Sequence, residues 1–248
     1  MKVRVLQTAA VILAGMVAGG VAADEIRVAV ATNFAEPMSA LVAQFSETSG
    51  HTVLVSAGST GGHYAQIKNG APFEAFFAAD VERPTLLEQE GIAVRGSRFL
   101  YAVGRLALWS PRPGFVDDEG RVLETGEFRF LAIANPELAP YGAAARDVLM
   151  ARNVWSKVQE RLVQGQDIGQ AYSFVFTGNA ELGFVAYSQI KKPEGQAAGS
   201  HWLVPQSLHR PIAQEAVLLR DVPAAREFME FVKSPAARVI MRRYGYGP

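Results

Sequence analysis

The sequence contains no cysteine, no surplus of charge of either sign and few histidines. Of its 248 residues, 24 are Lys or Arg and 24 are Asp or Glu, so the chain offers no basic surface for nucleic acid and no acidic tail. Without Cys it forms no disulfide and carries no thiol for a lipid anchor. The four His are scattered without ligand spacing, which argues against a zinc site and against direct metal ligands.

The sequence also lacks a second apolar run of membrane-spanning length, and its one long apolar run lies at the N-terminus. Lys2 and Arg4 precede an apolar stretch over 5–21, small residues follow, and Asp24 and Glu25 open the rest of the chain. This order is typical of a secretory signal peptide over residues 1–23, so we expect export to the periplasm. The alternative is a membrane anchor, but the run is short and rich in Ala and Gly.

Strand and helix patterns alternate through the remaining chain. Buried strands are predicted over 25–31, 52–55, 73–79, 130–134, 162–163, 182–186 and 213–219, with helices between most of them. The apolar stretch 99–109 is longer than a typical strand, and we expect it to run from one lobe into another. The pattern predicts two similar α/β lobes, with the C-terminal part of the chain returning to the first lobe.

Small and hydroxyl residues gather at strand-to-helix turns. Four turns share this character: Thr32-Asn33, Ser59-Thr60-Gly61, Pro140-Tyr141-Gly142 and Asp167-Ile168-Gly169. Ligands of open α/β sheets bind outside the carboxyl ends of the strands, so these turns are expected to meet. Each helix start carries about half a positive charge, and no Lys or Arg lies inside the turns. The turns together therefore suit a dianion that accepts hydrogen bonds and donates none.

Two other interpretations of these residues stay open at this point. Each turn is also compatible with an ordinary helix start, and Asp80 and Asp167 are interpreted as helix caps. An exported hydrolase is the alternative from another class, with Ser59 as nucleophile and His63 as base. The sequence has no Gly-x-Ser-x-Gly elbow, so we expect a binding protein and no enzyme.

At these turns the sequence resembles the periplasmic molybdate-binding proteins of ABC importers, over roughly residues 24–246. The motifs that carry the resemblance are 31–34 (ATNF), 56–61 (SAGSTG), 64–67 (YAQI), 69–72 (NGAP), 76–80 (FFAAD), 96–99 (GSRF), 135–136 (NP), 139–142 (APYG), 182–186 (LGFVA) and 199–202 (GSHW). Each motif alone is weak, but together in this order and spacing they are specific.

The resemblance implies a two-lobed, type II periplasmic binding protein fold, in which each lobe is a mostly parallel sheet flanked by helices. It implies lobe I over residues 24–101 plus 206–248, lobe II over 102–205, and a ligand in the cleft. The implied function is a high-affinity periplasmic receptor for molybdate, and for tungstate, that delivers the ion to an ABC transporter permease in the inner membrane. A monomer without a cofactor is expected. The alternative ligand is another tetrahedral oxyanion such as sulfate.

The resemblance also implies the contacts with the oxyanion. The implied donors are hydroxyl and backbone N–H groups of Thr32, Asn33, Ser59 and Thr60, the phenol or backbone N–H of Tyr141, and the backbone N–H of Ile168. Many relatives have Ser at the position of Thr60, whose extra methyl group bears on the size of the pocket. Some relatives have a Tyr ligand at the position of Ala186, a role that Tyr141 is expected to take here.

Overall fold

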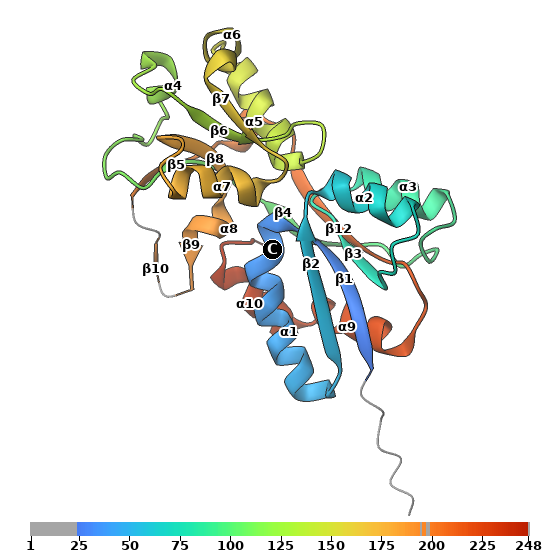
Figure 1. Cartoon of the computed structure of the whole chain (residues 1–248). Helices are drawn as coiled ribbons and strands as arrows, with labels where there is room; N and C mark the ends of the chain where they lie inside the picture. The colour runs from blue at the N-terminus through green and yellow to red at the C-terminus, as the bar shows by residue number, and fades with distance from the viewer. Residues whose placement is uncertain (1–23, 194, 197–198, 248) are drawn as a thin grey trace, which may run out of the picture.

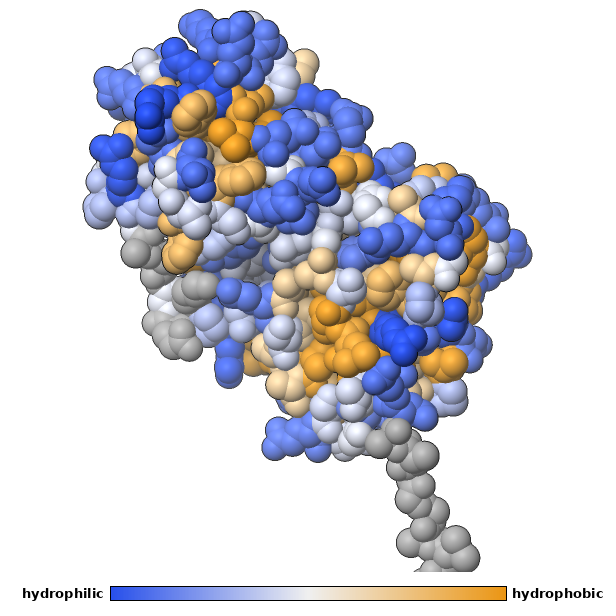
Figure 2. Space-filling view, viewed as in Figure 1, coloured by the Kyte–Doolittle hydropathy of each residue, from blue (hydrophilic) through white to orange (hydrophobic). Residues whose placement is uncertain are grey.

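The computed structural model describes residues 24–193, 195–196 and 199–247, and the predicted signal peptide lies outside them. The chain forms two bodies, each built on a five-stranded sheet (Figure 1). In the space-filling view the two bodies adjoin along the middle of the molecule, and an apolar surface covers part of the lower body (Figure 2).

The first sheet has the strand order β2 (Thr52–Gly58), β1 (Glu25–Ala31), β3 (Ala75–Phe77), β12 (Ile212–Leu218) and β4 (Phe99–Gly104). Strand β1 pairs in parallel with β2 and β3, whereas β12 is antiparallel to β3 and β4. Helices α1 (Ala35–Ser49), α9 (Pro223–Lys233) and α10 (Pro235–Arg243) share one core with this sheet. Helices α2 (Thr60–Lys68) and α3 (Glu82–Gln89) pack in a separate core on it.

The second sheet has the strand order β11 (Ser200–Leu203), β5 (Leu106–Ser110), β8 (Leu182–Ala186), β6 (Leu131–Ala134) and β7 (Leu162–Gly165). Strand β6 is parallel to β7 and β8, and β5 is antiparallel to β8 and β11. Helix α5 (Pro140–Ala151) packs in the larger core of this body, and α7 (Ile168–Phe176) contributes to both of its cores.

Short elements complete the described chain. They are η1 (Thr32–Phe34), α4 (Val122–Thr125), α6 (Trp155–Val158), η2 (Gln159–Arg161), α8 (Tyr187–Ile190), β9 (Lys191–Lys192), β10 (Gly195–Gln196) and η3 (Gln206–Leu208). The two-residue strands β9 and β10 form a hairpin within 191–200, where the sequence predicts only a loop. No helix among the described residues is long and apolar enough to cross a membrane.

Local sequence signals explain where the helices beside the site begin and end. Gly50 stops α1 because it adopts φ 78°, a left-handed conformation that glycine reaches without a steric penalty. Pro140 occupies the first turn of α5, where its missing N–H costs no helical hydrogen bond. The predicted crossing stretch 99–109 is two strands, β4 in the first sheet and β5 in the second, separated at Arg105. The parallel strands β1, β2, β6 and β7 all lead into the turns singled out above.

Candidate functional site

A small cavity lies where the two bodies meet, and residues from all four turns line it. Its lining consists of Ala31, Thr32, Asn33, Gly58, Ser59, Thr60, Ala79, Ala139, Pro140, Tyr141, Asp167 and Ile168. The six residues that the resemblance implies as ligands, Thr32, Asn33, Ser59, Thr60, Tyr141 and Ile168, are therefore brought together. The space among these residues is small, at about 190 Å³.

The first turn presents a buried hydroxyl that has no partner. Thr32 follows β1 and begins η1, and its Oγ1 is buried without a hydrogen bond within the described part of the chain. A buried polar group left unpaired costs about 1–3 kcal/mol, so this hydroxyl is suited to a ligand in the cavity. The neighbouring Asn33 side chain points elsewhere, because its Nδ2 donates to Gln214 Oε1 at 2.9 Å and to the Tyr246 hydroxyl at 2.9 Å. Asn33 thus has only its backbone N–H left for the cavity.

The start of α2 contributes two hydroxyl groups. Ser59 is the N-cap, and its Oγ accepts a hydrogen bond from Gly62 N at 3.2 Å. Thr60 Oγ1 is buried and accepts a hydrogen bond from Ala79 N at 3.0 Å. Because both oxygens act as acceptors in these bonds, both hydroxyl protons stay available for donation to an anion.

The second body contributes backbone N–H groups from two helix starts. The first N–H groups of a helix have no partner within it, and Pro140 carries none, so Tyr141 presents the first free N–H of α5. Asp167 caps α7 as predicted, since its Oδ1 accepts from Gly169 N at 2.7 Å and from Gln170 N at 3.0 Å. The N–H of Ile168, at the first position of α7, is not among those that the Asp167 side chain binds, and Ile168 lines the cavity.

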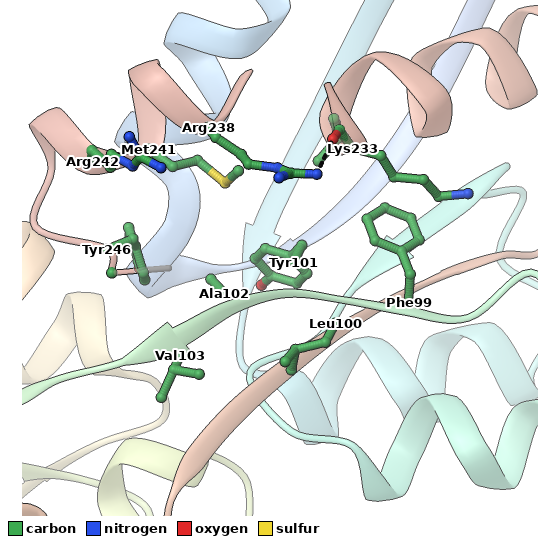
Figure 3. A pocket seen from close by; sticks show the side chains of 12 residues that line it. Phe99, Leu100, Tyr101, Ala102, Val103, Lys233, Arg238, Met241, Arg242 and Tyr246 are labelled. Atoms are coloured by element: carbon green, nitrogen blue, oxygen red, sulfur yellow. Dashed lines mark hydrogen bonds between the residues drawn. The ribbon is translucent and has the colours of Figure 1, made fainter. Parts of the chain in front are cut away.

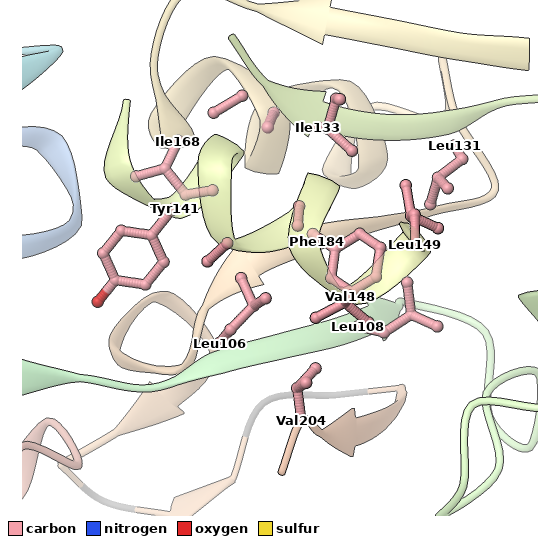
Figure 4. Packing of buried hydrophobic residues seen from close by; sticks show 14 of the residues in the cluster. Leu106, Leu108, Leu131, Ile133, Tyr141, Val148, Leu149, Ile168, Phe184 and Val204 are labelled. Carbon is pink, nitrogen blue, oxygen red and sulfur yellow. The ribbon is translucent and has the colours of Figure 1, made fainter. Parts of the chain in front are cut away.

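The phenol of Tyr141 lies at the edge of the apolar core of the second body. Figure 4 shows its hydroxyl pointing away from the cluster that contains Leu106 and Phe184. The phenol oxygen accepts a hydrogen bond from Gln214 Nε2 at 3.2 Å, and burial raises the pKa of Tyr141 well above its ordinary value. The phenol is therefore neutral and engaged in a buried network, which favours the backbone N–H over the phenol as the group available to a ligand.

The electrostatics of the cavity come from neutral groups. Among the described residues that line it, none is Lys or Arg, and Asp167 is the only acid. The helix starts supply partial positive charge, and the hydroxyl groups supply directed donors. Such a site can hold an anion that accepts hydrogen bonds on all sides, and it offers little to a cation.

The two bodies also touch directly around the cavity. Gly61 N donates to Leu138 O at 2.8 Å, and Ser188 Oγ donates to Asn33 O at 2.8 Å. Arg83 Nη2 donates across the same gap to the Glu137 carbonyl at 3.0 Å. These hydrogen bonds join the first body to the second, so the structure has the two bodies closed over the cavity.

Arg83 is held for this contact by an ion pair with Asp80. Burial raises the pKa of the Asp80 carboxyl, although the nearby Arg83 guanidinium acts in the opposite direction. Asp80 Oδ1 also accepts a hydrogen bond from Arg83 N, in the first turn of α3, at 3.0 Å. Asp80 thus binds a first-turn N–H as a cap does, although the N-cap position itself is Val81.

The geometry does not form the nucleophile and base of a hydrolase. Ser59 Oγ is bonded to Gly62 N, whereas His63 Nδ1 lies 3.1 Å from Gln66 Oε1. His63 is buried, and desolvation lowers its pKa. Within the described residues, no group of three or more His, Cys, Asp or Glu is placed to hold a metal ion.

A larger cavity of about 1,030 Å³ lies elsewhere, along the free edge of β4 (Figure 3). Apolar side chains of β4 face Arg238, Met241 and Arg242 of α10 across it. None of the predicted site residues lines this cavity. Its size alone therefore does not make it the functional site.

Sequence reasoning missed a buried network behind the small cavity. Its members are Asn33, Tyr101, Tyr141, Ser188, Gln214 and Tyr246, linked by hydrogen bonds of 2.8–3.2 Å. The one local signal is Gln214, a polar residue of β12 with no exposed surface. The network connects turns of both bodies and stands directly behind the site.

Two mixed α/β sheets with a small donor-lined cavity between them define the class as a two-lobed solute-binding protein. The family model for bacterial extracellular solute-binding proteins matches residues 26–247, and the chain belongs to this family. The molybdate-binding protein ModA of Azotobacter vinelandii is 51% identical over 237 residues, which cover 94% of each chain. ModA of Rhodobacter capsulatus is 50% identical over 228 residues, 91% of this chain and 89% of that one.

A solved structure gives the same result. The periplasmic molybdate-binding protein of Azotobacter vinelandii superposes with a TM-score of 0.88 at 43% identity, covering 90% of this chain and 99% of that one. This match confirms the predicted two-lobed periplasmic binding protein fold. The prediction of a mostly parallel sheet in each lobe is wrong, because each sheet has two parallel and two antiparallel pairings. The relatives are named as binding proteins, which confirms the prediction of a receptor in place of an enzyme.

Proposed function

We propose that the protein is a high-affinity receptor for molybdate, and for tungstate, that delivers the ion to an ABC transporter permease. The observation that carries this proposal is the unpartnered Thr32 hydroxyl in a small cavity without Lys or Arg. Molybdate and tungstate are tetrahedral dianions that accept hydrogen bonds and donate none at neutral pH. The names of the two relatives at 50% and 51% identity support the choice of ligand.

In this proposal six residues contact the oxyanion. The hydroxyl groups of Thr32, Ser59 and Thr60 and the backbone N–H groups of Asn33, Tyr141 and Ile168 donate to its oxygens. Charge-assisted hydrogen bonds contribute about 1.5–3 kcal/mol each, so six of them suffice for affinity between micromolar and nanomolar after ordering and desolvation costs. The metal atom itself has no protein ligand.

The proposal includes two lobes that close on the ion. Lobe I comprises residues 24–101 plus 206–248, and lobe II comprises residues 102–205, although residues 102–104 complete β4 of the first sheet. The ion stabilises the closed form because only that form surrounds it with donors from both lobes. We further propose that the protein is a periplasmic monomer whose first 23 residues direct its export.

Another tetrahedral oxyanion such as sulfate is the alternative ligand, because its charge and shape are similar. Calorimetric titration of the purified chain with molybdate, tungstate, sulfate and phosphate distinguishes a molybdate and tungstate receptor from a receptor for another oxyanion. We expect tight binding of molybdate and tungstate and weak or no binding of phosphate, which carries a proton that needs an acceptor. Tight binding of sulfate without a response to molybdate would overturn the assignment.

The variant Thr32→Val tests the site within this experiment. It removes the unpartnered hydroxyl but keeps the shape of the side chain, so affinity is expected to fall about 10- to 150-fold without loss of stability. Ser39→Ala is the control, since Ser39 Oγ donates to Ala35 O on the exposed side of α1. Unchanged affinity in Thr32→Val would exclude Thr32 as a ligand.

A further inference from the structure

Gln214 stands between the two halves of the proposed binding site. It lies on β12 with no exposed surface, where the pairing register between β12 and β4 shifts between Gln214 and Glu215. Such irregularities of a strand re-aim side chains and are frequent beside functional sites. The side chain of Gln214 reaches the turn after β1 and the start of α5 from this position.

The carboxamide of Gln214 uses both of its ends. Its Oε1 accepts from Asn33 Nδ2 at 2.9 Å and from the Tyr101 hydroxyl at 2.9 Å. Its Nε2 donates to the Tyr141 hydroxyl at 3.2 Å. Asn33 and Tyr101 belong to the first body, but Tyr141 belongs to the second, so only the last of these bonds crosses between the bodies.

A glycine makes the crossing contact possible. A Cβ at Gly104, the last residue of β4, would lie 2.6 Å from Gln214 Nε2 and would collide with the Tyr141 hydroxyl. Any other residue at this position would therefore push the two side chains apart. Because Gly104 has no Cβ, the Gln214 carboxamide and the Tyr141 phenol have room to meet beside it.

We propose that Gln214 is a positioning residue that couples the two halves of the anion site. It orients the Asn33 turn in lobe I, and through the Tyr141 phenol it holds the start of α5, whose N–H faces the cavity. Its bond to Tyr141 forms only when the lobes are closed, so it slows the release of the ion. This inference rests on the proposed function and adds to it a residue that does not touch the ligand.

The chain offers a matched pair of single-atom variants for the test. Tyr141→Phe removes the bond of Gln214 across the lobes together with a hydrogen bond between the Tyr141 and Tyr246 hydroxyls, whereas Tyr101→Phe removes a bond to the same carboxamide within lobe I. The backbone N–H of Tyr141 remains in its variant. We expect Tyr141→Phe to accelerate molybdate dissociation about 3- to 10-fold with a nearly unchanged association rate. Tyr101→Phe should lower the melting temperature of the ligand-free protein but leave the dissociation rate unchanged.

A double-mutant cycle completes the experiment. Gln214→Met and Tyr141→Phe are combined, and dissociation is followed by stopped-flow fluorescence of the tryptophans. If the two side chains act through their mutual bond, the double variant dissociates no faster than the faster single variant. Additive effects, or equal acceleration in Tyr101→Phe, would overturn the inference. Should Gln214→Met not fold, Gln214→Leu takes its place in the cycle, because Tyr141→Phe alone also removes the hydrogen bond to Tyr246.

The wild-type measurement separates this inference from the proposed function. If the wild-type protein binds none of the four anions, the proposed function fails and the inference falls with it. If the wild-type protein binds molybdate and Tyr141→Phe releases it at the wild-type rate, only the role of Gln214 is refuted.

Discussion

Replacing Gly169 by Ala should weaken anion binding by blocking the approach of the two lobes. Gly169 lies in the first turn of α7, and Thr32 lies on the facing turn of the first body. A Cβ at Gly169 would collide with Thr32 Cγ2 and would lie 3.0 Å from Asp167 Oδ1. The closed arrangement therefore leaves no room for one additional methyl group.

The size of the effect follows from which side chain has to move. Rotating Thr32 away would turn its hydroxyl out of the cavity, and keeping it in place would force the lobes apart. Overpacking of this kind costs about 1–3 kcal/mol, and the collision with Thr32 adds this cost only to the closed form. The apparent dissociation constant should accordingly rise about 5- to 150-fold.

The same substitution should not harm folding, which makes the test specific. Ala in place of Gly at a helical position restricts the unfolded chain and stabilises a protein by about 0.4–1 kcal/mol. We therefore expect a ligand-free melting temperature that is unchanged or slightly raised, together with weaker binding by calorimetry. Ser173→Ala, on the exposed side of the same helix, is the control. Wild-type affinity in Gly169→Ala would refute closure through this contact.

Three further substitutions test other parts of the site. Arg83→Ala loses the hydrogen bond to the Glu137 carbonyl and should accelerate ion release about 3- to 10-fold in stopped-flow measurements, and wild-type release would exclude this bond as a latch. Asn33→Asp replaces a donor to Gln214 by an acceptor beside the anion, so anion affinity and melting temperature should both fall. If both stay at the wild-type values, the role given to the network is refuted. Burial lowers the pKa of His63, so the stability present above its ordinary value of 6.5 should be lost as pH falls below it. In the variant His63→Gln the melting temperature should depend less on pH below 6.5. An unchanged pH dependence would refute the assignment of this stability change to His63.

The sequence predicts most of the fold because local patterns determine it. Hydrophobic runs located nearly every strand of both sheets, and the length of 99–109 indicated the crossing between bodies. The sequence analysis places Pro140-Tyr141-Gly142 in a turn before a helix, whereas these residues already form the first turn of α5, in which Pro140 is a typical first residue. The antiparallel placement of β12 between β3 and β4 depends on contacts far apart in the chain, which periodicity does not report.

The candidate site also has a part that the sequence predicts, the turns at the helix starts, and a part that it does not, the buried network behind them. Hydroxyl residues and glycines at helix starts are visible as short motifs, so the sequence predicts the four turns that contribute to the lining of the cavity. The network behind it could not, because Asn33 meets partners 181 and 213 positions away, and Gln214 meets Tyr141 from 73 positions away. Gln214 stands beside Glu215 in β12, and the sequence does not show which of these two polar residues is buried in a network.

Because this site has no Lys or Arg, its selectivity among anions depends on the same hydrogen bonds that the anion makes when the two lobes close. A lysine or arginine would attract any anion, whereas a fixed N–H or O–H group needs a lone pair in one direction. Thr32 and Thr60 approach from one body, and the N–H groups of Tyr141 and Ile168 approach from the other. A ligand that is too small, or that carries a proton, cannot accept hydrogen bonds from the donors of both bodies. Each buried donor left unpaired then costs about 1–3 kcal/mol of binding free energy. Closure and recognition of a fully deprotonated tetrahedral ion are therefore one event, and a substitution that holds the lobes apart should reduce selectivity together with affinity.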